Sequence, residues 1–431
     1  MAFLINLIVG IILFFYGVKI YTSYNLRPVS NPCGTGENYY LNKHLHFLLF
    51  SIATSMVFLG PFSLVKYVFW FAILVILIFF FRLKFDIIVG SYILFLLWAL
   101  FSMSYTSELY QGTMLLIKYA LPMLYLWLGY NAINGKEDFI IFLKKSNIIL
   151  ILYALFIGGF AYKVFPFLYS LLLFKSGGLF IAYASLADFF TALFVIPLTL
   201  YVITKRSKYL YAALWLLLST VLEVVRTGLG GIALSIMFFG FIFYKWRAVP
   251  FVVFPVILFV IAILFIPDVR EKMFVDDSNT AIAQTSLTFD NIQSNGRELI
   301  WEKNIEKFYK PNPLIGAGLG TSVSYTKDNF AVHLIHSDYV QILCDMGSIG
   351  LSFFCLFFIV LVCKVVYCCW FGYNKDDFVR LSGAMAVGSC AGVLFSMAFD
   401  NVVSYSQQCF VFPFLFIGIF LKAIDLCKDY N

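Results

Sequence analysis

Apolar windows of about 20 residues, the length of a membrane-spanning helix, recur along most of this chain. The backbone polar groups of such a window must be satisfied within the bilayer, so only a helix or a strand of a closed barrel is possible there. Barrel strands alternate apolar and polar residues, whereas these windows are continuously apolar, which predicts helices. A chain that is 62% hydrophobic and 12% charged also has too little polar surface for a soluble fold. We therefore predict an all-α polytopic membrane protein.

We predict thirteen spans, although a poor boundary at Gly60-Pro61 also allows twelve spans and a re-entrant element. The predicted spans cover residues 3–21, 47–63, 67–82, 86–103, 114–131, 147–165, 182–203, 209–224, 228–244, 248–266, 347–371, 381–399 and 407–423. No small-residue cleavage site follows the first span, so we expect no cleavable signal peptide. One long polar segment interrupts the series. It separates an N-terminal bundle of about ten spans (1–266) from three C-terminal spans and a short tail (347–431).

The polar segment, residues 267–346, holds two of the four histidines. Placing it outside leaves 18 Lys and Arg residues in the loops of the opposite face and five in the remaining outer segments. Long loops are excluded from this comparison because they cross the membrane largely regardless of charge. The asymmetry predicts that the segment is extracytoplasmic. The net charge of +7 then reflects topology and does not indicate nucleic-acid binding.

Six ionisable residues are predicted to lie in or beside spans near the outer face, where a charge in lipid is costly. They are Lys118, Lys163, Asp188, Glu223, Arg226 and Asp400. Each has a structural explanation on its own: the lysines can extend to the interface, and Glu223 and Arg226 can pair on one helix. Six on one side predict a polar cavity that opens to the outer leaflet.

Arg226 stands directly before a glycine-rich turn that we expect between two spans, at Thr227 to Gly231. A guanidinium beside the free N–H groups of a helix end is suited to bind a phosphate. The glycines can equally serve close helix packing. Both interpretations stay open at this point.

The second half of the polar segment has a regular pattern. Residues 296–310 predict a helix with glutamates at every fourth position, which Pro311 ends. A glycine-rich loop follows at 314–320, and it matches no nucleotide-binding fingerprint.

The next predicted helix begins at Ser337 or Asp338, either of which can cap it, and Gly347 can close it. His336 then lies at a helix N-terminus, which carries a partial positive charge. This charge disfavours the protonated imidazole and so favours the neutral form that a general base needs. A metal site of His333, His336 and Asp338 is possible, but the spacing is not diagnostic, and we predict no metal.

These residues resemble the O-antigen ligase and polymerase superfamily. Its pattern is an arginine before a helix that bears a tryptophan, then a proline, a glycine-rich run, a histidine with a polar neighbour, and paired glycines before the next span. The matching residues are Arg297, Trp301, Pro313, Gly316, Gly318, His336, Ser337, Leu343, Gly347, Ser348, Ile349, Gly350 and Leu351, with Arg226 to Gly228 as the family's earlier arginine turn. The chain departs from the pattern at Asp338, where a hydrophobic or small residue is common.

The resemblance implies a helical bundle like that of GT-C glycosyltransferases, with about 12–13 transmembrane helices and one large, partly helical extracytoplasmic loop. It also implies an inverting, metal-independent glycosyltransferase without a cofactor, whose donor is a glycan on undecaprenyl pyrophosphate. His336 is then the catalytic general base, and Arg226 and Arg297 bind the pyrophosphate as its negative charge grows. The substrate-binding residues expected with them are Asp188, Glu223, Trp301, Asp338, Tyr339 and Asp400.

Polymerases and ligases of this superfamily share the donor and differ in the acceptor, and the motifs do not separate them. The 51 Phe and 27 Tyr residues and the modest loop favour a polymerase, which joins lipid-linked repeat units of O-antigen or a related surface polysaccharide at the outer face of the bacterial inner membrane. The alternatives are a ligase that transfers the glycan to lipid A-core and, from another class, a non-catalytic transporter or flippase of lipid-linked sugars. The expected partners are the lipid-linked glycan, as donor and acceptor, the bilayer, a chain-length regulator and a flippase, and no nucleic acid.

Overall fold

The computed structural model describes most of the chain from residue 84 onward and short parts of what precedes it. The described residues are 15, 28–29, 39–40, 43–55, 84–167, 184–223, 225–248, eight single positions between 253 and 270, 296–330, 332, 334–405 and 407–429. Of the predicted spans, 3–21, 67–82 and 248–266 fall wholly or largely outside these residues, and so does His333.

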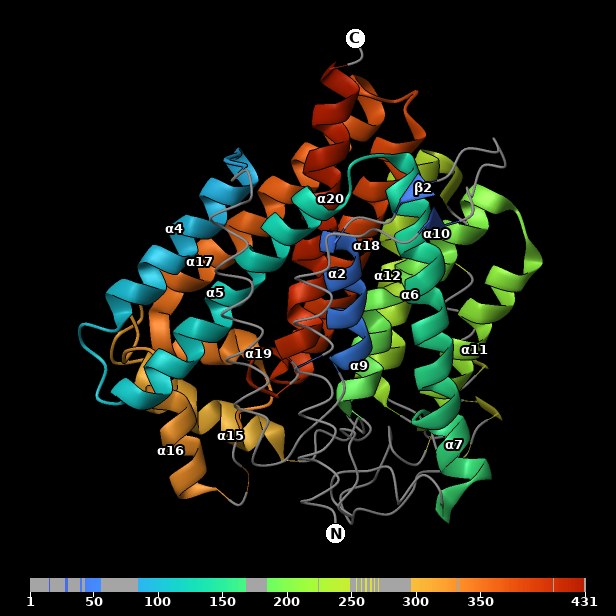
Figure 1. Ribbon diagram of the computed structural model, residues 1–431. Coiled ribbons are helices and arrows are strands. Elements are labelled where there is room, and N and C mark those ends of the chain that lie inside the picture. Colours follow the sequence, from blue (N-terminus) through green and yellow to red (C-terminus); the bar gives the residue numbers. More distant parts are fainter. Residues whose placement is uncertain are drawn as a thin grey trace.

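Helices make up almost all of the described structure, as predicted for an all-α membrane protein (Figure 1). The α-helices are α2 (Lys43–Thr54), α4 (Ile87–Ser102), α5 (Leu109–Ala132), α6 (Lys136–Phe156), α7 (Gly159–Val164), α9 (Ala184–Leu193), α10 (Val195–Thr204), α11 (Ser207–Glu223), α12 (Arg226–Tyr244), α15 (Arg297–Asn304), α16 (Thr321–Asn329), α17 (Asp338–Tyr367), α18 (Asp377–Phe399), α19 (Val402–Tyr405) and α20 (Gln407–Asp429). A 3-10 turn, η3 (Lys245–Ala248), and two π-helical turns, η6 (Ile305–Tyr309) and η7 (Cys368–Gly372), extend three of them. Two short strands, β1 (Pro28–Val29) and β2 (Tyr39–Tyr40), pair antiparallel.

Seven helical stretches in the described part of the chain are long and apolar enough to cross a membrane. They are Leu109–Ala132, Lys136–Val164, Leu186–Thr204, Arg226–Ala248, Asp338–Gly372, Asp377–Phe399 and Cys409–Lys428. Each contains most of one predicted span. The predicted spans 86–103 and 209–224 correspond to the shorter helices α4 and α11.

Glycines let the central helices approach closely. A Cβ added at Gly418 of α20 would lie 1.9 Å from the Leu126 carbonyl oxygen of α5, and one at Gly129 of α5 would lie 2.2 Å from the Leu415 carbonyl oxygen. Small residues at helix crossings are typical of membrane bundles, where close van der Waals contact drives association. The α5–α20 pair therefore depends on having no side chain at these positions.

The glycines after Arg226 serve the same purpose, and this corrects the expected turn. Residues 227–231 form the first turns of α12 and not a connection between spans. A Cβ at Gly228 would lie 2.8 Å from that of Ala187, and one at Gly231 would lie 2.5 Å from a Thr191 methyl group. The packing interpretation of these glycines is therefore confirmed, while Arg226 itself stays at a helix N-terminus.

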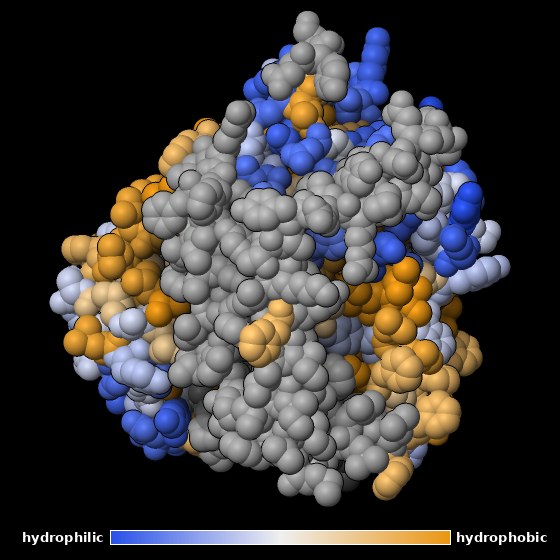
Figure 2. Space-filling view, viewed as in Figure 1, coloured by the Kyte–Doolittle hydropathy of each residue, from blue (hydrophilic) through white to orange (hydrophobic). Residues whose placement is uncertain are grey.

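The surface has the distribution expected of a protein in a bilayer. Hydrophobic residues lie along both flanks in Figure 2, between hydrophilic groups at the top and at the lower left. Large apolar side chains on these helices are exposed, among them Leu97, Phe101, Ile148 and Tyr211. Lipid contact accounts for this exposure, since a water-soluble protein rarely exposes contiguous apolar surface of this extent.

The two ends of the bundle carry different structures. α15 and α16 cover one end, at the bottom of Figure 1, and the C-terminal end of α20 lies at the opposite end. α12 begins and α18 finishes at the end that α15 covers, because Arg297 of α15 donates a hydrogen bond to the Phe399 carbonyl oxygen and α12 packs along α18. The candidate functional residues are at this end.

Candidate functional site

The glycine-rich loop wraps around a kink in α17. Gly347 has a φ of +66° inside this helix, and the N–H groups of Ser348 and Ile349 donate to the carbonyl oxygens of Pro313 and Leu314. A Cβ at Gly347 would lie 2.2 Å from the Leu314 carbonyl oxygen. The predicted end of the first helical segment at Gly347 is thus confirmed, and the closeness of two backbones explains the glycine.

Asp345 fixes the other half of this loop. Its carboxylate, fully buried, accepts the N–H of Gly320 at 2.8 Å and that of Ser322 at 2.9 Å, and so caps α16. Tyr105, between α4 and α5, donates its hydroxyl to the Ile315 carbonyl oxygen at 2.6 Å. Burial, together with the nearby Asp345 charge, raises the pKa of Tyr105 to about 12, so it stays a neutral donor. The loop is a structural clamp that holds α16 and α17 together.

His336 lies at the N-terminus of α17, as predicted. The Ser337 hydroxyl caps the helix by accepting the Val340 N–H. His336 itself has a φ of +60°, a left-handed conformation that residues other than glycine rarely adopt. Its N–H donates to the side-chain oxygen of Asn401, and this bond holds the strained residue in place.

The imidazole of His336 faces a carboxylate. Its Nδ1 lies 3.1 Å from Oδ1 of Asp400, the residue that follows α18. The His336 side chain is 26% exposed and that of Asp400 only 8%. A buried carboxylate on Nδ1 favours the tautomer with its proton on that nitrogen, which leaves Nε2 with a lone pair for a substrate proton.

A buried polar network supports this pair. The side-chain amide of Asn401 donates to Oδ1 of Asp338 at 3.3 Å and to Oε1 of Gln341 at 3.0 Å. Asp338 also accepts the Val403 N–H at 3.2 Å. Asp338, Gln341 and Asn401 are fully buried, so the network ties the first turn of α17 to the connection between α18 and α19.

The two arginines lie near each other at the same end of the bundle. Arg297 begins α15 and reaches the Phe399 carbonyl oxygen, directly before Asp400. Arg226 begins α12 at this same end, and its charge lies within electrostatic range of Arg297. Guanidinium groups at one end of the bundle are chemically suited to an anion with more than one negative charge.

Trp301 and Tyr339 have partners within the protein. The Trp301 indole N–H donates to the Ile335 carbonyl oxygen at 2.8 Å, directly before His336. The Tyr339 hydroxyl donates to the Leu394 carbonyl oxygen of α18 at 3.0 Å. Both side chains therefore help to position the segment that carries His336.

Glu223 and Asp188 are the site residues that the structure does not bring to His336. Glu223 is buried at the end of α11, where it accepts the N–H of Gly159 at 2.9 Å. Asp188 is buried on α9, with Cys409 of α20 in its electrostatic environment. In the described part of the chain, neither carboxylate joins the His336 network through a hydrogen bond or an ion pair.

The sequence did not single out Asn401 or Gln341. Asn401 lies in the apolar C-terminal region, and its partners His336 and Asp338 come more than 60 residues earlier. The break between two apolar helices at Asp400-Asn401 was the available sign, because a polar pair there needs partners. Among the described residues, no three His, Cys, Asp or Glu side chains converge as a metal site.

The arrangement can remove a proton from a hydroxyl beside a bound anion. His336 supplies a base oriented by Asp400, and the two arginines supply positive charge nearby. Residues 211–355 match the O-antigen ligase family, a region that includes Arg226, Arg297 and His336 and stops before Asp400. No curated protein matches the chain significantly. Residues 211–355 are therefore a domain of the O-antigen ligase family, which ligases and polymerases of O-antigen share, within a multi-pass membrane protein.

Proposed function

We propose that this protein is an inverting glycosyltransferase that polymerises undecaprenyl-pyrophosphate-linked repeat units into O-antigen or a related surface polysaccharide. The family domain implies transfer of a glycan and lipid-linked glycan substrates. The observation that carries the proposal furthest is the His336–Asp400 pair, because it provides an oriented base at the end of the bundle where the helices of Arg226 and Arg297 begin.

The proposed reaction is a single displacement. Nε2 of His336 takes the proton of a sugar hydroxyl on the acceptor repeat unit, and the hydroxyl oxygen attacks the anomeric carbon of the donor glycan. The bond from that carbon to the pyrophosphate oxygen breaks, so the configuration at the carbon inverts. Undecaprenyl pyrophosphate leaves with the bonding electrons, and the proton stays on His336 until it is released to water.

Arg226 and Arg297 are proposed to bind the pyrophosphate. Negative charge increases on the leaving group during the reaction, so fixed cations stabilise the transition state more than the ground state. The position of both arginines supports this role, because Arg226 begins α12 and Arg297 begins α15 at the same end of the bundle. The reaction needs no metal in this proposal, since the arginines supply the charge that a divalent cation supplies elsewhere.

Asp400 is proposed to orient His336 and to stabilise the imidazolium that forms. This role is added to the substrate binding that was expected of Asp400. Asp338, Trp301 and Tyr339 are proposed to position the His336 segment, because each has a hydrogen-bond partner within the protein. Asp188 and Glu223 are proposed to contact the lipid-linked substrate at a distance from His336.

We place this site on the extracytoplasmic face of the inner membrane. The asymmetry of Lys and Arg between short loops supports this orientation. In the cell, the proposed partners are a flippase that delivers the repeat units and a chain-length regulator.

Polymerase and ligase are distinguished by the acceptor. Purified protein given lipid-linked repeat units alone should produce a ladder of longer lipid-linked glycans if it is a polymerase. No ladder, with transfer only after lipid A-core is added, would establish the ligase instead. Movement of lipid-linked repeats across a vesicle membrane, without new glycosidic bonds, would establish the transporter.

A further inference from the structure

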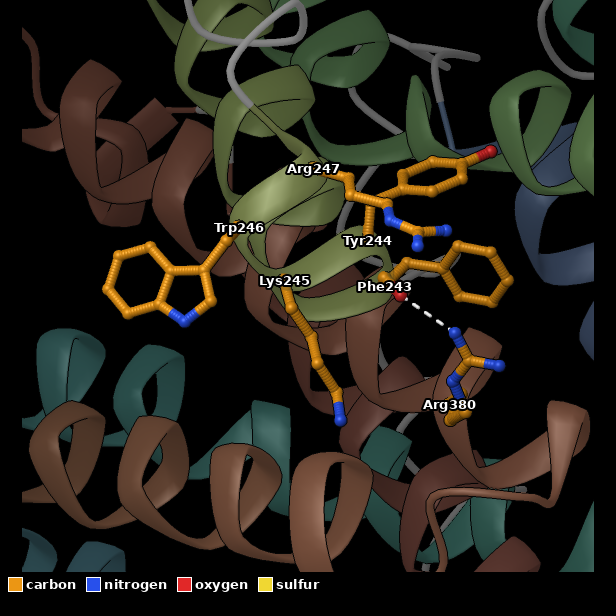
Figure 3. A pocket seen from close by; sticks show the side chains of 6 residues that line it. All are labelled: Phe243, Tyr244, Lys245, Trp246, Arg247 and Arg380. Carbon is orange, nitrogen blue, oxygen red and sulfur yellow. Dashed lines mark hydrogen bonds between the residues drawn. The ribbon is translucent and has the colours of Figure 1, made fainter.

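A second candidate binding site lies at the opposite end of the bundle, between α12 and α18. A pocket of about 400 Å³ is formed there by the last residues of α12, the turn η3 and the start of α18. Its lining residues are Phe243, Tyr244, Lys245, Trp246, Arg247 and Arg380 (Figure 3). The 19 residues of α12 rise about 28 Å, so this pocket and Arg226 are separated by roughly the thickness of the hydrocarbon core.

The pocket has an excess of positive charge that the described residues do not neutralise. Three of its six lining residues are cationic, and only Arg380 has a carboxylate partner, Asp377 at 3.3 Å. In the described part of the chain, no carboxylate lies within ion-pair distance of Lys245 or Arg247. Two other lysines at this end have carboxylate partners, Lys84 with Asp425 at 2.7 Å and Lys364 with Asp86. The two unneutralised cations therefore require an anion from outside the described chain, or water.

Two of the cations are held in place. Arg380 donates to the Phe243 carbonyl oxygen at 2.8 Å, and its guanidinium lies 4.4 Å from the centroid of the Phe243 ring. Lys245 donates to the Trp370 carbonyl oxygen at 3.2 Å and has a φ of +56°, a conformation that turns the chain out of α12. In Figure 3 the side chains of Arg247, Tyr244 and Phe243 extend to one side, while Trp246 points to the other side.

Exposed aromatic side chains lie in the pocket lining, in η7 and at the end of α17. Trp246 is 81% exposed, Phe371 68% and Tyr367 64%. The Trp246 and Trp370 rings are 6.3 Å apart. Aromatic residues of this kind gather at the level of the lipid headgroups, where their rings meet both acyl chains and water. The pocket is thus at the height of the headgroups and next to the acyl chains.

We infer that this pocket binds the phosphate headgroup of an anionic membrane lipid in the leaflet opposite the His336 site. Cations between helices at the membrane surface are suited to a lipid phosphate, and the adjacent exposed rings are suited to its acyl chains. A soluble phosphate compound would have the same attraction to the cations but would leave the rings without a partner. The inference does not depend on the proposed glycosyltransferase activity.

The test measures binding of phosphatidylglycerol to the full chain in a zwitterionic detergent by native mass spectrometry. Two double variants are compared, Lys245→Ala with Arg247→Ala and, as a control, Lys205→Ala with Arg206→Ala. The control pair is exposed at the same end of the bundle, and Lys205, like Lys245, ends a helix with a positive φ. Both variants therefore lose two charges and place alanine in a left-handed conformation. Melting temperature without lipid checks that each variant is folded.

The expected result is about 10- to 30-fold weaker phosphatidylglycerol binding for the pocket variant and little change for the control. Phosphatidylcholine should bind weakly to all three proteins, and millimolar inorganic phosphate should not displace phosphatidylglycerol. Equal losses of phosphatidylglycerol binding in both variants would overturn the inference. The lipid would then be attracted to the positive charge of this whole face and not to the pocket. Displacement by inorganic phosphate would also overturn it, since the site would then serve a soluble phosphate.

Discussion

Nδ1 of His336 lies 3.1 Å from Oδ1 of Asp400, although the two residues are 64 positions apart in the chain. His336 comes from the end of the polar segment and Asp400 from the end of α18. The contact forms because α17 and α18 pack together and Asn401, next to Asp400, accepts the His336 N–H. One short connection, between α18 and α19, therefore fixes both the backbone and the ring of the proposed base.

Asp400→Asn should lower the rate of chain growth by about 10²–10⁴-fold, because an amide neither fixes the imidazole tautomer as a carboxylate does nor stabilises the imidazolium. KM for the lipid-linked repeat should change much less than kcat. Asp377→Asn, exposed at the other end of α18, is the matched control and should keep the wild-type rate. A normal kcat in Asp400→Asn would remove Asp400 from the mechanism.

Asn401→Leu should reduce both stability and rate, since it removes the acceptor of the His336 N–H and a donor to Asp338. Leaving such buried groups without partners costs about 1–3 kcal/mol. The melting temperature of the purified protein in detergent and its rate of chain growth measure the two effects. Asn329→Leu, exposed at the end of α16, is the control. If Asn401→Leu lowered only the melting temperature, Asn401 would be structural and would not position the base.

Arg226→Lys and Arg297→Lys should each impair chain growth nearly as much as the alanine variants, because an ammonium cannot replace a guanidinium that donates two bonds to a phosphate. Lys310→Ala removes an exposed charge from the same polar segment and should leave chain growth unchanged. Yields of long polymer are compared at equal protein expression. Wild-type chain lengths in either lysine variant would show that its arginine does not bind the pyrophosphate in this way.

A cysteine at Asp328 should react with an impermeant thiol reagent in intact cells, or in spheroplasts where an outer membrane blocks access. Asp328 is exposed near the end of α16, whereas Ser324 is half-buried and donates to Glu108, so it is a poorer position. A cysteine at Asp377 reports on the other end and should react only after lysis. The reverse pattern would place the His336 site in the cytoplasm and exclude the proposed reaction there.

The sequence predicted the helices well, because continuous apolar windows allow little else in a membrane. It also predicted the helix from residue 297, the loop at 314–320, the cap at Ser337 and the break at Gly347, each of which has a local pattern. The glycines after Arg226 were ambiguous, since both a phosphate site at a helix end and a close helix crossing favour small residues. The packing of α12 against α9 and α18 shows the crossing, and phosphate binding at Arg226 stays a prediction.

The hydrogen bonds that hold the site residues in place were harder to predict. Arg226, Arg297 and His336 belong to recognisable motifs, but the role of Asn401 depends on contacts with residues 60 or more positions away. No local pattern encodes such a contact. For the same reason the hydrogen bonds of Trp301 and Tyr339 to backbone carbonyl oxygens were not predicted, while their contact with substrate stays a prediction.

The central claim is that His336 is the base of a glycan-transfer reaction. The most direct measurement is chain growth by purified protein with lipid-linked repeat units, in the presence of EDTA, for the wild type, His336→Ala and His333→Ala. The account predicts chain growth without metal in the wild type and in His333→Ala. It predicts a loss of about 10²–10⁴-fold in His336→Ala, which leaves single repeat units on the lipid. Chain growth in His336→Ala at the wild-type rate, or strict dependence of the wild type on a divalent metal, would contradict the account.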